Sequence, residues 1–122
     1  MELVKENNLP LIISYYDDQS FIINEIKYTS HLYISSTGDI RLIDSSQFEE
    51  QKIIDLTKSF VTVPEILLIG TGRNVNHLLM MNLMAGTNTY PFEIMNTSSA
   101  IRTFNVIKSE GRKIEALLQL NT

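Results

Sequence analysis

The chain of 122 residues contains no cysteine, which excludes a disulfide framework, a thiolate metal site and a cysteine nucleophile together. Its only two histidines, His31 and His77, have no spacing typical of a metal-ligand set. No apolar run approaches the roughly 20 residues of a membrane-spanning helix, and residues 1–10 lack the features of a signal or transit peptide. We therefore expect a soluble, cytoplasmic protein with no metal ion and no other cofactor.

Positive charge is scarce as well, since the net charge is −4, and this argues against nucleic-acid binding. Hydrophobic residues make up 43% and charged residues 20%, values typical of a globular protein. The length predicts one domain over residues 1–122. The charge is uneven, because residues 1–61 hold ten acids and five bases while residues 62–122 hold four acids and five bases. The basic C-terminal part is either a solvated surface or one that attracts an anion or a partner.

The order of expected elements predicts an α/β fold. β-Branched and aromatic runs indicate strands at residues 11–16, 21–28, 31–35 and 40–43, with turns between them that favour an antiparallel layer. Helices then alternate with strands: a helix from about 48 capped by Ser46, a strand at 65–69, a helix at about 74–85, a strand at 89–95, a helix ending near 109 and capped by Thr97 or Ser98, and a strand at 113–120. This alternation predicts right-handed crossovers and a largely parallel sheet beneath the antiparallel layer.

The helix at about 74–85 is apolar nearly all round. At helical spacing Leu78, Leu79 and Leu83 gather on one side. The opposite side, a candidate interface, carries His77, Met80, Met81 and Met84. Either the sheet covers the leucines while another element covers the methionines, or the methionines form an adaptable contact surface for a partner or a second copy of the chain.

A glycine corner, Gly70-Thr71-Gly72-Arg73, joins a buried strand to this helix. Such a corner suits a phosphate-binding turn, although the third small residue of a dinucleotide fingerprint is replaced by Val75 and no P-loop lysine follows. The other interpretation is a plain tight turn that places Arg73 near the strand ends.

The last helix carries a core stripe and a polar stripe. Ala100, Phe104 and Ile107 recur at core spacing. The narrow polar stripe on the far side consists of Arg102, Asn105 and Ser109, and the turn Glu110-Gly-Arg112 follows it. The spacing alone favours solvated or structural roles for these residues. The arginines are nevertheless fork donors suited to a carboxylate or phosphate.

The segment 92–112, with Arg102-Thr-Phe-Asn105 and Glu110-Gly-Arg112, resembles the signature of the Mth-nine-three-eight-like domain family of unknown function. Ile69-Gly-Thr-Gly72 resembles the glycine corner of that family. The resemblance implies a three-layer β+α/β/α fold with a mixed central sheet and no established enzyme activity. It also implies a role in assembling respiratory, complex I-like membrane complexes through protein partners. Phe104 stands where the family often has tyrosine, which weakens any reaction that would need that hydroxyl.

Two functions follow. The first is a non-enzymatic interaction module, with no catalytic residue, that uses the methionine face of the helix at about 74–85. The second is a small-ligand or anion site, or an enzyme site, at the strand ends. Its candidate residues are Arg73, Glu93, Arg102, Asn105, Glu110 and Arg112.

Overall fold

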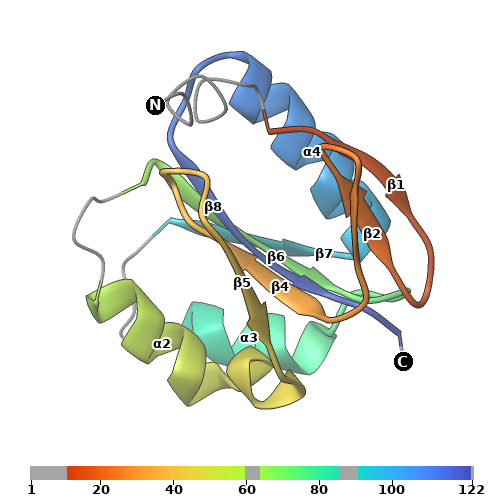
Figure 1. Ribbon diagram of the computed structural model, residues 1–122. Coiled ribbons are helices and arrows are strands. Elements are labelled where there is room, and N and C mark those ends of the chain that lie inside the picture. The colour runs from red at the N-terminus through yellow and green to blue at the C-terminus, as the bar shows by residue number, and fades with distance from the viewer. Residues whose placement is uncertain (1–10, 60–63, 86–90, 122) are drawn as a thin grey trace.

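The fold is taken from a computed structural model that describes residues 11–59, 64–85 and 91–121 (Figure 1). The strands are β1 (Ile13–Tyr16), β2 (Phe21–Ile23), β3 (Ile26–Tyr28), β4 (His31–Ile34), β5 (Ile40–Ile43), β6 (Ile66–Thr71), β7 (Phe92–Met95) and β8 (Ile114–Gln119). The helices are the short 3-10 helix η1 (Ser45–Phe48) and the α-helices α2 (Glu50–Lys58), α3 (His77–Ala85) and α4 (Thr97–Ser109).

The N-terminal layer is a three-stranded antiparallel sheet in the order β1-β2-β3. The single strand predicted over residues 21–28 was wrong, because the chain reverses at Asn24 and Glu25 to form β2 and β3. Both turn residues have positive φ, 48° and 73°, as a two-residue hairpin turn of the type I′ family requires. The usual Asn-Gly signal is missing here, since glutamate occupies the second position, and for this reason the sequence pattern hid the turn.

The central sheet has five strands in the order β5-β4-β8-β6-β7. β4 runs antiparallel to β5 and β8, whereas β6 runs parallel to both β7 and β8. Leu67, Leu68 and Ile69 of β6 are fully buried, as expected for a continuously apolar strand covered on both faces. The mixed central sheet implied by the family resemblance is confirmed.

Two apolar cores lie on the two faces of this sheet (Figure 1). α4 and the three-stranded sheet cover one face, and the core there includes Phe21, Leu68, Phe104 and Leu118. α2 and α3 cover the other face, around Ile53, Leu67, Leu83 and Leu117. The predicted β+α/β/α layering is therefore confirmed. Within the described ranges, each helix is too short or too polar to cross a membrane.

Two helix caps differ from the prediction. Ser46, the predicted cap of the helix from about 48, lies inside η1, where its N–H donates to the capping Asp44 side chain. The longer helix α2 starts after Glu49, which makes no side-chain cap bond. Asn96, not Thr97 or Ser98, caps α4 by accepting from the Ser99 N–H. Asparagine caps helices better than threonine does, and the Thr97 hydroxyl is engaged elsewhere. The Thr97 hydroxyl accepts from the Gly72 N–H and donates to the Gln119 carbonyl, each at 2.7 Å.

Candidate functional site

α3 leaves much of its apolar surface uncovered. Leu79 and Leu83 are buried in the core beneath the sheet, as predicted. Leu78, which was expected beside them, is 69% exposed, and Met81 and Met84 are 63% and 70% exposed. Of the two alternatives for the methionine side, the exposure of Met81 and Met84 favours the uncovered contact surface, whereas Met80 is half-buried. We call Leu78, Met81 and Met84 the α3 surface, and His77 lies exposed at its start.

A groove of about 460 Å³ continues the α3 surface toward the edge of the central sheet. It is lined by Met80, Met84, Pro91, Phe92, Glu93 and Ile94, so one wall comes from α3 and the other from β7 and the residue before it. β7 is the last strand in the sheet order. The groove therefore joins an exposed apolar helix face to a sheet edge.

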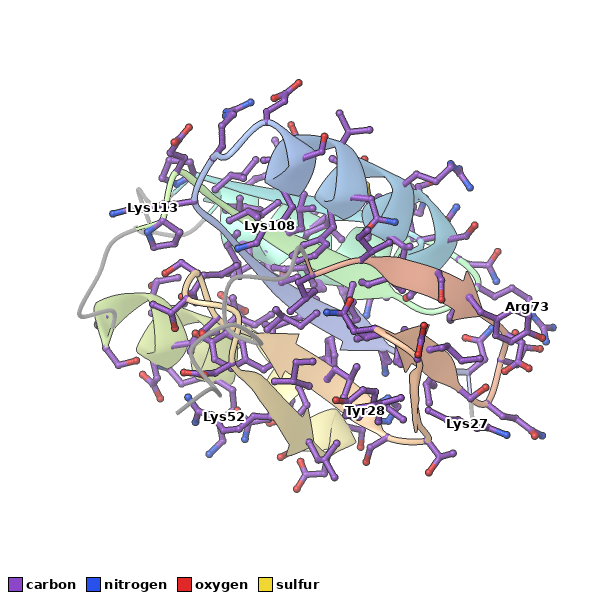
Figure 2. The ribbon with its side chains drawn as sticks, turned by 45° about the horizontal axis from the view of Figure 1, so that its top comes forward. Lys27, Tyr28, Lys52, Arg73, Lys108 and Lys113 are labelled. Carbon is purple, nitrogen blue, oxygen red and sulfur yellow. The ribbon has the colours of Figure 1, made fainter. Side chains whose placement is uncertain are left out.

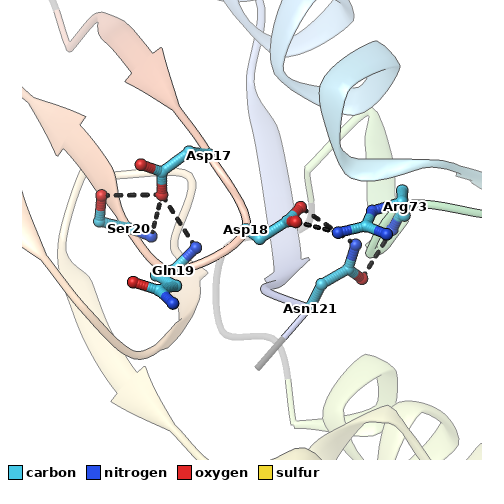
Figure 3. Close-up of polar contacts among 6 residues, drawn as sticks. All are labelled: Asp17, Asp18, Gln19, Ser20, Arg73 and Asn121. Carbon is cyan, nitrogen blue, oxygen red and sulfur yellow. Dashed lines mark hydrogen bonds and ion pairs between the residues drawn. The ribbon is translucent and has the colours of Figure 1, made fainter.

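Arg73 is held in a polar clasp at the carboxyl end of β6 (Figure 3). Its guanidinium pairs with the Asp18 carboxylate, and the backbone N–H of Arg73 donates to Asn121 Oδ1 at 2.8 Å. Asn121 Nδ2 in turn donates to Asp18 Oδ1 at 3.3 Å. The hydrogen bond from Arg73 is the main reason that the pKa of Asp18 lies below its usual value. The clasp ties the β1–β2 turn to the glycine corner and to the residues after β8.

The N–H groups of the glycine corner have protein partners. The Gly72 N–H donates to Thr97 Oγ1, the Arg73 N–H to Asn121, and the Asn76 N–H to Thr71 Oγ1 at 2.9 Å. A phosphate cradle needs such donors to point at the ligand. Here the same donors connect neighbouring segments of the chain, an arrangement that supports the plain-turn interpretation.

The polar stripe of α4 divides into separate local contacts. Arg102 is exposed and donates to the hydroxyls of Ser98 and Ser99 at 2.9 and 3.1 Å. Asn105 is partly buried and binds both backbone groups of Ile13 on β1. The two therefore serve different purposes, although they share one stripe in the sequence pattern.

Arg112 and Glu110 belong to a second ion cluster, which includes Glu65. Arg112 Nε donates to Glu65 Oε1 at 2.9 Å, and its Nη1 lies 3.6 Å from Glu110 Oε1. The hydrogen bond from Arg112 is the largest cause that lowers the pKa of Glu65. All three side chains are about half exposed, so the pairs contribute little to stability.

The clasp around Arg73 and the ion cluster around Arg112 lie at opposite ends of the central sheet. Glu65 precedes β6 and Arg73 follows it, eight residues later, which corresponds to about 26 Å at roughly 3.3 Å per strand residue. Glu93 on β7 lies beside Leu68 of β6. Leu68 precedes Arg73 by five residues, so about 16 Å along the strand direction separates Glu93 from the level of Arg73. In Figure 2, Lys113, the residue that follows Arg112 in the chain, and Arg73 lie at opposite sides of the molecule. The six candidate binding residues are thus dispersed over several surfaces.

Sequence reasoning missed a buried acid. Glu115 on β8 is 3% exposed, accepts a hydrogen bond from the Tyr33 hydroxyl, and accepts another from the Ser36 N–H at 2.9 Å. These contacts fasten the β4–β5 turn to the centre of the sheet. A lone acid inside the apolar run 114–120 was the available signal. No group of three or more metal-ligating side chains occurs in the described part of the chain.

A larger cavity, of about 870 Å³, lies between the three-stranded sheet, the β4–β5 turn and the end of α4. Ile12, Ile23, Ile26 and Ile40 contribute apolar walls, and Lys108 and Asp39 contribute charges. Lys108 Nζ approaches the Ser36 carbonyl at 3.5 Å, a long contact. Figure 2 labels Lys108 and Tyr28, which line this cavity from α4 and β3.

Comparisons with known proteins agree with this architecture. The model of a family described as "Protein of unknown function (DUF498/DUF598)" matches residues 13–119. A Bordetella parapertussis protein of known structure is 21% identical, with a TM-score of 0.68, and the match covers 93% of this chain and 98% of that one. A Bartonella henselae protein described as an outer membrane protein is 23% identical over 90% and 94% of the two chains, with a TM-score of 0.65.

A third structure, a Bordetella pertussis protein described as a Mth938-like domain, is 19% identical over 92% and 87% of the two chains, with a TM-score of 0.64. At these identities the likeness supports the fold alone, and that fold is the one implied by the motifs in residues 92–112. No curated protein matches the chain.

Proposed function

The chain belongs to the DUF498/DUF598 family of proteins of unknown function, and from that premise we propose that it is a non-enzymatic interaction module that binds a protein partner through the α3 surface. The observation that carries the proposal is the exposure of Leu78, Met81 and Met84 on a helix that contains no Asp, Glu, Lys or Arg. Exposed apolar patches of this kind mark interaction sites. Methionine suits such a surface because its flexible side chain adapts to the shape of a partner.

The size of the interaction energy can be bounded from these three side chains. Full burial of a leucine or methionine contributes roughly 1.5–3 kcal/mol, and about two thirds of each side chain is still available, so the α3 surface can contribute about 3–6 kcal/mol. Association costs consume much of that, and about 4 kcal/mol corresponds to a Kd of only about 1 mM. A specific partner must therefore also contact the neighbouring groove.

The proposed partner is a component of a respiratory, complex I-like membrane complex during its assembly. The support for this partner is the family resemblance of the segment 92–112, and the exposed α3 surface supplies a face for such a contact. A second copy of the chain is the competing occupant. It would give a homo-oligomer in the purified protein.

Affinity capture from detergent-solubilised membranes of the source cell tests the proposal. The baits are the wild-type chain, the double variant Met81→Lys with Met84→Lys, and a matched control, Val106→Lys, at an exposed apolar position on α4. We expect respiratory-complex subunits to be enriched by the wild type and by the control, and lost with the double variant. Equal capture by all three baits, or no respiratory component with the wild type, would refute the proposal. Light scattering of the purified chain detects the homo-oligomer.

A second candidate function, small-ligand binding, is favoured by the cavity beside Lys108. Its volume of about 870 Å³ lies within the range of ligand pockets, and its apolar walls with few charges are typical of them. By contrast, Arg73, near which a strand-end site was expected, has its guanidinium paired with Asp18. Chemical-shift mapping with octanoate, comparing the wild type with Lys108→Met, tests the cavity. Shifts confined to its lining and weakened in the variant support ligand binding, and an unperturbed lining refutes it for this probe.

A further inference from the structure

The edge of β7 presents backbone hydrogen-bonding groups beside the groove. The Leu67 N–H donates to the Pro91 carbonyl at 3.1 Å, and Leu67 is in register with Phe92. In a parallel ladder the backbone groups of alternate residues face the same neighbouring strand. Pro91, Glu93 and Met95 therefore direct their backbone groups toward β6, while Phe92 and Ile94 direct theirs outward. Within the described residues, β7 pairs with β6 alone.

Side chains on this edge alternate in a way that defines two faces. Phe92 and Ile94 pack toward the core beneath the sheet, the side on which α3 lies. Met95 packs toward α4, and Glu93, two residues before it, shares that face. A strand added to β7 would follow the same alternation. Its residues opposite Phe92 and Ile94 would point toward Met80 and Met84, and those opposite Glu93 would point to the α4 face.

The charges make this edge selective. Glu93 is the one Asp, Glu, Lys or Arg in the sequences of α3 and β7, and its side chain is exposed. The opposite charge on a neighbouring strand stabilises the pair, and a like charge opposes it. The groove side, in contrast, is lined by Met80, Met84, Phe92 and Ile94 and favours an apolar side chain.

We infer that the partner contributes an extended segment that adds to the free edge of β7 as a sixth strand, with apolar side chains in the Met80–Met84 groove and a basic side chain opposite Glu93. The inference rests on the proposed interaction function and deepens it by stating what the partner presents. Strand addition suits this surface because the backbone bonds supply affinity and the groove supplies side-chain selectivity. A helical ligand would leave the outward groups of Phe92 and Ile94 without partners from the ligand.

The probe is an eight-residue peptide that alternates valine and lysine, and the control peptide has the same composition arranged in two blocks. We expect the alternating peptide to slow amide hydrogen exchange at Phe92 and Ile94 at least tenfold at saturation. The amides of Glu93 and Met95, which already face β6, are internal controls and change little. The block peptide should bind at least fivefold more weakly. Unchanged exchange at Phe92 and Ile94 under saturating peptide overturns the inference.

A charge exchange gives an independent readout. Glu93→Lys changes an exposed side chain and should weaken binding of the valine–lysine peptide about threefold to tenfold. The same variant should bind a peptide that alternates valine and glutamate more tightly than the wild type does. Equal affinities of the wild type and the variant for both peptides overturn the pairing with Glu93.

The two proposals fail separately. If membrane capture depends on Met81 and Met84 while the peptides protect neither Phe92 nor Ile94, strand addition is wrong and the α3 interaction stands. If the alternating peptide protects both amides while the double variant at Met81 and Met84 captures the partner as well as the wild type does, strand addition is supported. The proposal that the partner docks on the α3 surface is then wrong.

Discussion

Asn105 on α4 binds Ile13 on β1 through both backbone groups of that residue. Its Oδ1 accepts from the Ile13 N–H at 3.1 Å, and its Nδ2 donates to the Ile13 carbonyl at 2.9 Å. The side-chain amide thereby takes the place that a neighbouring strand would occupy, and it fixes the three-stranded sheet on α4. A residue expected to contribute to a binding surface thus has an architectural task.

Replacement of this amide should destabilise the fold. Asn105→Ala leaves both partly buried groups of Ile13 without their partner, and we expect a loss of about 2–4 kcal/mol in the free energy of unfolding. Urea denaturation measures the loss, and faster amide exchange at Ile13 locates it. Arg102→Ala, on the exposed side of the same helix, is the control and should change stability by less than about 0.5 kcal/mol. Equal losses in both variants would contradict this role.

Gly70 should tolerate alanine poorly because α4 approaches the β6 backbone there. An added Cβ would lie 2.9 Å from Thr97 Cα and 3.1 Å from Ala100 Cβ. Overpacking of this kind costs about 1–3 kcal/mol, so Gly70→Ala should lower the thermal midpoint clearly. Gly111→Ala is the comparison, since its Cβ would meet no atom within 4 Å but its φ of 77° disfavours alanine. We expect a smaller loss there, about 1 kcal/mol, and the reverse order would be inconsistent with the close approach.

The Asp18–Arg73 pair predicts a specific dependence on pH. Because the folded state lowers the pKa of Asp18, the stabilisation is fully present above the unfolded pKa, about 3.9, and is lost as pH falls through the lowered folded value. Arg73→Gln should return the pKa of Asp18 toward its usual value in a carboxyl-detected NMR titration. The stability difference between wild type and variant should shrink below about pH 4. Arg102→Gln should leave the Asp18 titration unchanged, and a shift there would implicate general charge instead of the pair.

The exposure of α3 predicts two opposite responses on one helix. Met81→Lys replaces a largely exposed side chain and should change the unfolding free energy by less than about 0.5 kcal/mol. Leu83→Ala removes a side chain that is 1% exposed and should cost about 2–5 kcal/mol. Chemical denaturation of both variants measures the contrast. A comparable loss from Met81→Lys would mean that this methionine is packed, which removes the basis of the docking surface.

Local patterns in the sequence determined much of the fold. The apolar run at 65–69 indicated a strand buried on both faces, and the stripe Ala100, Phe104 and Ile107 predicted the side of α4 that packs on the sheet. The motifs in residues 92–112 resembled the right family. These predictions depend on periodicity and on short motifs, which a sequence displays directly.

Tertiary structure alone decided which polar groups meet. Arg73 pairs with Asp18, 55 residues away, and Asn105 binds Ile13, 92 residues away, and no spacing along the chain indicates either contact. Tertiary structure also decided which side of α3 is buried. Its sequence required cover on both sides, yet the sheet covers Leu79 and Leu83 and leaves Met81 in solvent. A helical period assigns residues to faces, but only the placement of neighbouring elements determines which face is buried.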